Sequence, residues 1–133
     1  MLTVHHFGFL VKSLEKSLPV FQLLGYVSTG TAVYDKLRNV RLLLLEKDAV
    51  RLELIEPGES SALHGALTKL RNTAYHVCYE TTSISQTENL LLNNGFIRVE
   101  APAPAELFGG RFVAFYAHAQ LGMIELLQIQ AVE

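Results

Sequence analysis

Two histidines and two glutamates occur in this chain as two copies of one pattern. His6 lies near the start of an apolar segment, and Glu53 follows it by 47 residues inside another apolar segment. His76 and Glu125 repeat the arrangement with an interval of 49 residues. Two neutral imidazoles and two carboxylates form a ligand set that suits a divalent first-row metal ion. The duplication therefore indicates a metal site made of these four side chains.

Each of the four residues also has a structural interpretation. A single histidine in an apolar strand is usually a packing residue, and His5 stands beside His6 as a competing ligand. The register of the repeat and the alternation of strand faces both select His6. A glutamate could face solvent on an edge strand. An unpaired carboxylate among leucines and isoleucines, however, would cost several kcal/mol or take up a proton. A bound cation removes that cost for Glu53 and Glu125 together.

The repeat extends over most of the chain and suggests a gene duplication. At an offset of 70 residues, His6–Phe9 aligns with His76–Tyr79 and Arg41 aligns with Arg111. At Glu53 and Glu125 the offset is 72. We place both extra residues of the second copy in the turn at 117–122. Turns absorb length changes, whereas a one-residue slip within a strand inverts every side chain.

The elements that must position these residues follow from the hydrophobic pattern. Residues 3–11 alternate as a strand, with Phe7, Phe9 and Val11 on one face and His6 on the other. A helix is expected from Ser13 to Gly25, irregular at the internal Pro19. The second helix starts at Ser83 with a capping-box sequence and ends at Gly95. We expect the bulky strand face to pack under the helix and the histidine face to leave room for a ligand.

Short strands then begin at Tyr26 and Phe96, and the Pro-rich stretch 101–107 is expected to be a loop. Two hairpins complete the copies, with strands expected at 40–46 and 50–55, and at 111–116 and 123–129. The order β-α-β-β-β thus occurs twice. It predicts an α+β fold of two βαβββ modules that form a curved half-barrel sheet around a central cavity. A single domain is expected over 1–133, with modules at 1–57 and 73–133 and a connector at 58–72 that holds a helical turn at 62–70.

Composition narrows the function classes. The chain has 133 residues, of which 50% are hydrophobic, and a formal net charge of −2. The sequence lacks the stripe of basic residues that is typical of a nucleic-acid binder. Its longest apolar run, 40–45, is too short to span a bilayer. The N-terminus lacks the pattern of a signal peptide, so we expect a cytoplasmic location. The only cysteine, Cys78, excludes an internal disulfide and is expected to be a buried, inert thiol.

Two arginines recur as well. Arg41 and Arg111 each stand at the start of an expected strand, where they could bind a substrate carboxylate or phosphate. The alternative, a surface arginine that pairs with a nearby acid, is equally compatible with the sequence.

The chain resembles the vicinal oxygen chelate superfamily, which includes glyoxalase I, methylmalonyl-CoA epimerase, extradiol dioxygenases and bleomycin-binding proteins. The resemblance covers essentially the whole chain, and its methylmalonyl-CoA epimerase branch is the most similar. Four segments carry it: His6–Val11, Leu52–Pro57, Tyr75–Glu80 and Gly122–Leu127. There are two departures. Tyr75 stands where that branch commonly has a second histidine, and Glu53 stands where some of its members have glutamine. A glutamate at this position is more like the ligand set of glyoxalase I.

The resemblance implies a site and a chemistry. The metal ligands would be His6, Glu53, His76 and Glu125, and the ion would be Co²⁺, Ni²⁺, Zn²⁺ or Mn²⁺. The activity would be that of an isomerase or epimerase that removes a proton next to a metal-bound carbonyl, for example in a 2-substituted acyl thioester. Glu125 is the expected base and Glu53 the second choice.

Two other functions remain open on this resemblance. One is a glyoxalase I-type lyase that acts on a glutathione hemithioacetal. The other is a non-catalytic small-molecule binding or resistance protein, against which the complete ligand set counts. The expected partners are a small-molecule substrate and, as in other small members, a second copy of the chain in a homodimer; nucleic acid and membrane are not expected.

Overall fold

The computed structural model describes residues 2–65 and 73–129. The chain divides into two compact units, His6–Tyr75 and Met1–His5 together with His76–Glu133. Within the described ranges no helix is both long and apolar enough to cross a bilayer. The helical turn expected at 62–70 is seen only at His64 and Gly65, because residues 66–72 lie outside the described residues. The boundaries expected for the two modules stay a prediction.

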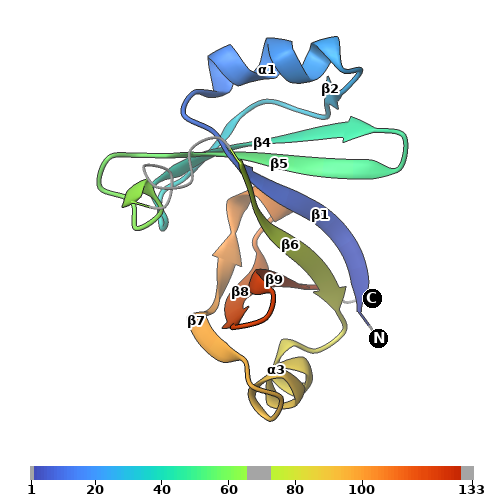
Figure 1. Ribbon diagram of the computed structural model, residues 1–133, viewed down its shortest axis with the longest axis vertical. Coiled ribbons are helices and arrows are strands. Elements are labelled where there is room, and N and C mark those ends of the chain that lie inside the picture. The colour runs from blue at the N-terminus through green and yellow to red at the C-terminus, as the bar shows by residue number, and fades with distance from the viewer. Residues whose placement is uncertain (1, 66–72, 130–133) are drawn as a thin grey trace. The chain divides into compact units, whose positions relative to one another are not determined.

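The first module has the strand order β2-β4-β5-β1, and β3 also pairs with β4. Its strands are β1 (Thr3–Leu10), β2 (Val27–Ser28), β3 (Val33–Asp35), β4 (Val40–Lys47) and β5 (Val50–Pro57). β1 runs parallel to β5, whereas β4 runs antiparallel to it. Helix α1 (Leu14–Leu23) lies along one side of β4 and β5 (Figure 1).

The second module has the corresponding order β6-β9-β8-β7. It consists of β6 (Thr73–Thr81), α3 (Ile84–Leu92), β7 (Ile97–Ala105), a short 3₁₀ helix η1 (Glu106–Phe108), β8 (Arg111–His118) and β9 (Gly122–Gln128). β6 is parallel to β9, as β1 is to β5. The repeated β-α-β-β-β order is therefore confirmed. Two short strands, β2 and β3, pair with β4 in the first module, where the single strand β7 pairs with β8 in the second.

Both helices begin as expected from the sequence. Ser13 and Ser83 are extended residues whose hydroxyls accept the amide hydrogens of Lys16 and Gln86 at 3.2 Å. The capping box is only half formed, because the Ser83 amide donates to the Thr81 hydroxyl instead. The expected irregularity at Pro19 does not interrupt α1, which continues to Leu23.

A side chain of the last strand binds the first amide of each helix. The Leu14 amide donates to the Glu56 carboxylate at 2.9 Å, and the Ile84 amide donates to the Gln128 side chain at 3.0 Å. These amides have no partner inside the helix, so each bond satisfies a donor that would otherwise need water. Glu56 and Gln128 occupy equivalent positions, and they fix each helix start on its own sheet.

Apolar residues of alternate positions pack between each helix and its sheet. In the first module this core contains Val11, Leu14, Leu43, Leu45 and Leu54, with Phe9 and Phe21 in edge-to-face contact at 5.4 Å. In the second module it contains Ile84, Leu91, Ala114, Tyr116, Ile124 and Leu126. The expectation that Phe9 and Val11 pack under the helix is confirmed, whereas Phe7 is 40% exposed.

The strand pairing corrects the sequence alignment of the two copies. Leu44 lies opposite Glu53, and Phe115 lies opposite Glu125. β4 and β8 therefore correspond at an offset of 71, so that Arg41 matches Phe112 and not Arg111. One extra residue lies between Gly95 and the start of β8, and one lies in the turn at 119–121, whereas we expected both in the turn. Residues 40–45 are apolar on both faces apart from Arg41, so their alternation could not reveal the slip.

The Pro-rich stretch 101–107 is also not the loop that we expected. Residues 101–105 belong to β7, and Pro104 pairs with Phe112. β7 lies on the edge of its sheet, where a missing amide hydrogen is tolerated. Its register shifts at two places, between Arg98 and Glu100 and between Glu100 and Ala103. An edge position with bulges thus accommodates prolines that would exclude a central strand.

A buried tyrosine joins α3 to the edge of its sheet. The hydroxyl of Tyr116, a fully buried residue, donates to Glu88 at 2.7 Å, and the Arg98 guanidinium binds the same carboxylate at 2.7 and 2.9 Å. The hydrogen bond from Arg98, followed by that from Tyr116, lowers the pKa of Glu88. Burial is the main cause that raises the pKa of Tyr116. The ionised form of Glu88 therefore stabilises the fold.

We expect Glu88→Gln to lower the free energy of unfolding at pH 7 by about 1 kcal/mol. Because the folded-state pKa of Glu88 is lowered, the stabilisation is present above the unfolded value, near 4.5, and is lost as the pH falls through the folded value. Urea unfolding of both proteins between pH 7 and pH 3 measures the difference. A difference that stays constant on acidification would contradict this role.

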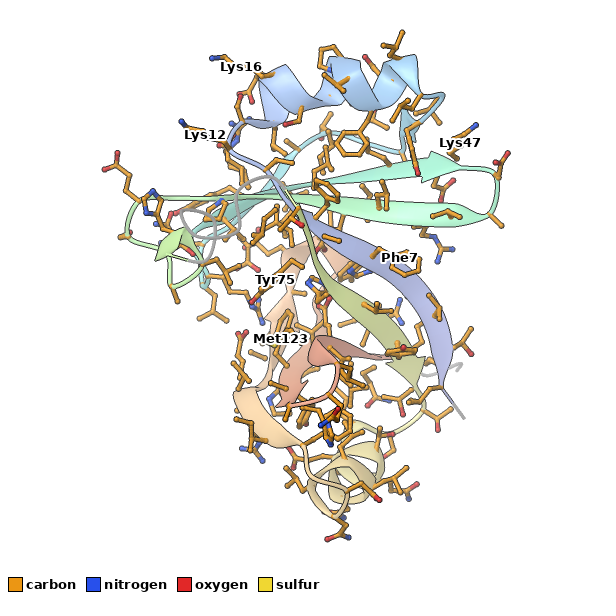
Figure 2. The ribbon with its side chains drawn as sticks, in the orientation of Figure 1. Phe7, Lys12, Lys16, Lys47, Tyr75 and Met123 are labelled. Atoms are coloured by element: carbon orange, nitrogen blue, oxygen red, sulfur yellow. The ribbon has the colours of Figure 1, made fainter. Side chains whose placement is uncertain are left out.

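Glycines end both helices, and a basic side chain lies against each. Gly25 and Gly95 have φ of +102° and +88°, and a Cβ on either would lie 3.0 Å from Lys47 Nζ or His118 Nε2, respectively. Lys47, at the β4–β5 turn, is labelled in Figure 2. His118 occupies the equivalent position in the second module. The left-handed conformation is what requires glycine at both positions, because a neighbour at 3.0 Å would have to shift by only a few tenths of an ångström.

Gly95→Ala should therefore reduce the free energy of unfolding by about 1 to 2 kcal/mol, because an alanine is strained at positive φ. Gly30→Ala is the matched control, since no atom lies within 4 Å of a Cβ there. Its effect should stay within about 0.5 kcal/mol. Equal stabilities of the two variants in urea unfolding would show that the helix end does not need glycine.

Candidate functional site

His6 and Glu53 form a buried pair in the first module. β1 and β5 are parallel with Gly8 opposite Glu53, so His6 and Glu53 lie on the same face, two positions apart. That face is turned away from the helix-side core formed by Phe9 and Val11. The residues are only 1% and 4% exposed. His6 Nε2 lies 3.6 Å from Glu53 Oε1.

His76 and Glu125 form the equivalent pair in the second module. Here Cys78 lies opposite Glu125 in the parallel pair β6–β9, which again places the histidine and the glutamate on one face. Both residues are buried, and His76 Nε2 lies 2.9 Å from Glu125 Oε1. The sequence repeat is thus a repeat of geometry, and the intervals differ by two residues because one extra residue precedes β8 and another precedes β9.

Each pair suits two adjacent ligands of one metal ion. Ligands at about 2.1 Å from an octahedral ion stand about 3.0 Å apart. The His76–Glu125 distance of 2.9 Å matches that separation, and the His6–Glu53 distance of 3.6 Å is longer. A buried carboxylate needs compensation, and a bound cation would supply it at each pair. The donor set of two imidazoles and two carboxylates fits Co²⁺, Ni²⁺, Zn²⁺ or Mn²⁺.

The surroundings of the second pair include residues that the sequence did not predict there. Phe115, for which the sequence indicated no role at the site, lies opposite Glu125, and its ring meets the His76 ring at 5.5 Å and 90°. Met123, which is labelled in Figure 2, lies opposite His76 in the strand pairing. Cys78 is buried and reduced, as expected, although it shares the face of His76. Only the corrected register of β8 could have placed Phe115 here.

The two arginines lie on different faces of their modules. Arg41 is on the helix side, where it binds Glu15 at 2.8 Å and Glu56 at 3.1 Å. The hydrogen bond from Arg41 lowers the pKa of Glu15. Arg111 shares the face of Glu125 and binds Glu80 and the Gln128 carbonyl, each at 2.8 Å. Both arginines therefore have acidic neighbours. Substrate binding by either arginine stays a prediction, and Arg111 is the better placed because it shares the face of Glu125.

The second unit also contains a pocket of about 380 Å³ beside the start of α3. Its lining includes Ser83, Glu88, Pro102 and Phe112. Phe112 is on the helix side of β8, so this pocket is distinct from the face that carries His76 and Glu125.

Comparison with known families gives one match that covers most of the chain. A sequence profile of the Glyoxalase/Bleomycin resistance protein/Dioxygenase superfamily matches residues 5–115, which include His6, Glu53 and His76. A comparison with curated proteins gives no match.

Solved structures share the fold at low sequence identity. A hypothetical protein from Bacillus halodurans C-125 is 23% identical, with a TM-score of 0.86 over 99% of this chain and 97% of the other. A variant of Streptomyces coelicolor methylmalonyl-CoA epimerase, in complex with 2-nitronate-propionyl-CoA, is 22% identical, with a TM-score of 0.84 over 100% and 99%. The epimerase from Mycobacterium tuberculosis is 20% identical, with a TM-score of 0.81 over 96% and 88%.

Proposed function

The chain belongs to the glyoxalase/bleomycin resistance protein/dioxygenase superfamily, and we propose that it acts as a metal-dependent epimerase. Its substrate would be a 2-substituted acyl thioester or a related carbonyl compound. One observation carries the proposal: each module holds a buried histidine and glutamate side by side on the strand face turned away from its helix. The likeness of the fold to methylmalonyl-CoA epimerases supports this choice of reaction.

We propose that the two pairs act as one ligand set for a single divalent cation. His6, Glu53, His76 and Glu125 would supply the four protein donors. When bound there, the cation would polarise a carbonyl group of the substrate and make the proton on the neighbouring carbon more acidic. The two carboxylates also balance the charge of the cation, so that none of the four polar side chains is buried without compensation.

The carboxylates have a second task in this proposal. Inversion at carbon requires that a proton leave one face and return to the other. Glu125 is the proposed base that takes the proton onto a carboxylate oxygen, and Glu53 is the alternative base or the group that returns a proton on the opposite face. In this proposal His6 and His76 act only as nitrogen ligands of the ion.

Other members of the superfamily carry out other chemistry, and the same donors could serve a glyoxalase I-type lyase. Such a lyase would consume a glutathione hemithioacetal. A non-catalytic small-molecule binding or resistance protein would convert neither the acyl thioester nor the hemithioacetal. A homodimer and a cytoplasmic location stay predictions.

The first test concerns the metal. Protein stripped with a chelator and loaded with Co²⁺ should bind about one ion per chain. His76→Ala should lower the affinity for Co²⁺ by at least about 100-fold, because one of the four proposed ligands is lost. His118→Ala is the control, since this histidine packs on Phe96 and should leave binding unchanged. Elemental analysis and titration measure both quantities, and full metal content in His76→Ala would contradict the assignment.

The second test concerns the base. With methylmalonyl-CoA in heavy water, the metal-loaded protein should exchange the proton on carbon 2 and interconvert the epimers. Glu125→Gln should lower the exchange rate by about 10²- to 10⁴-fold. Glu80→Gln, which alters the pair with Arg111, should keep most of the rate.

Mass spectrometry or proton NMR follows the exchange in each variant. A large loss only in Glu53→Gln would move the role of base to Glu53. Turnover of a hemithioacetal without any exchange of the thioester would favour the lyase, and no turnover of either substrate would contradict the proposed activity.

A further inference from the structure

We infer that Phe115 is a positioning residue that holds the His76 imidazole in its ligand orientation, an inference that rests on the proposed metal centre. The Phe115 and His76 rings are perpendicular, with centroids 5.5 Å apart. An edge-to-face contact of this kind favours one orientation of each ring over the others. A histidine ring free to turn would bring its nitrogen to the ion only part of the time.

Phe115 is itself held in place. It packs against a buried cluster of Cys78, Ala105, Val113 and Leu127 on the same face of the second module. On the neighbouring strand it stands directly opposite Glu125. The ring therefore lies beside both ligands of this module, on a support that does not depend on the ion.

The first module has a different residue at the corresponding position. Leu44 lies opposite Glu53 as Phe115 lies opposite Glu125, and a leucine offers no aromatic ring to the histidine. The nitrogen–oxygen distance is 3.6 Å in the first pair and 2.9 Å in the second. The pair with the aromatic neighbour is thus also the pair with the shorter distance.

The test compares Phe115→Leu, which reproduces the residue of the first module, with wild type and with Phe115→Tyr, which keeps the ring. Phe112→Leu is the matched control, because this residue is on the same strand, faces the other side and is 49% exposed. Co²⁺ affinity, the visible spectrum of the bound ion and the melting temperature are measured for all four proteins.

We expect Phe115→Leu to weaken Co²⁺ binding about 3- to 10-fold and to change the Co²⁺ spectrum, with affinity and spectrum restored in Phe115→Tyr. A merely structural role would lower the melting temperature and leave affinity and spectrum unchanged. That result, or an equal effect of Phe112→Leu on affinity, would overturn the inference while the metal centre stands. Wild-type protein that binds no Co²⁺ would overturn both the inference and the proposed function.

Discussion

The parallel pairing of the first and last strands in each module is the constraint on which the candidate site depends. It places a histidine of one strand and a glutamate of the other on the same face, two positions apart, in both modules. A slip of one residue would send one of the two side chains to the helix side. The candidate site therefore depends on strand register before it depends on residue type.

The opposite faces of the same strands explain why that register is stable. Glu53 and Glu56 are three residues apart in β5, so one faces the site and the other binds the first amide of α1. Glu125 and Gln128 divide the two roles in β9 in the same way. Helix packing and ligand placement therefore reinforce each other. A displaced last strand would lose a buried apolar face, a helix cap and a charge-compensated carboxylate at once.

The sequence predicted the order of the elements and the two His–Glu pairs, because both recur and because buried acids in apolar strands need an explanation. It did not predict the register of β8. Residues 40–45 are apolar on both faces apart from Arg41, and the coincidence of two arginines suggested the wrong offset. With the wrong offset Phe115 could not be placed beside Glu125, and Arg41 was aligned with Arg111, which lies on the opposite face. The strand of residues 101–105 was missed because its prolines are compatible with a strand only on an edge, and a single sequence does not identify edges.

The positions of the two extra residues have an evolutionary consequence. One lies between the end of α3 and β8, and the other lies in the turn before β9. The strand positions paired with the two glutamates are the same in both copies. Descendants of a duplicated ancestor could gain or lose residues at these connections while the ligands stayed aligned. An insertion between Glu53 and Glu56 would instead exchange the roles of the two faces. Length variation among relatives should therefore concentrate in the connections, and the segments from ligand to helix cap should keep a constant length.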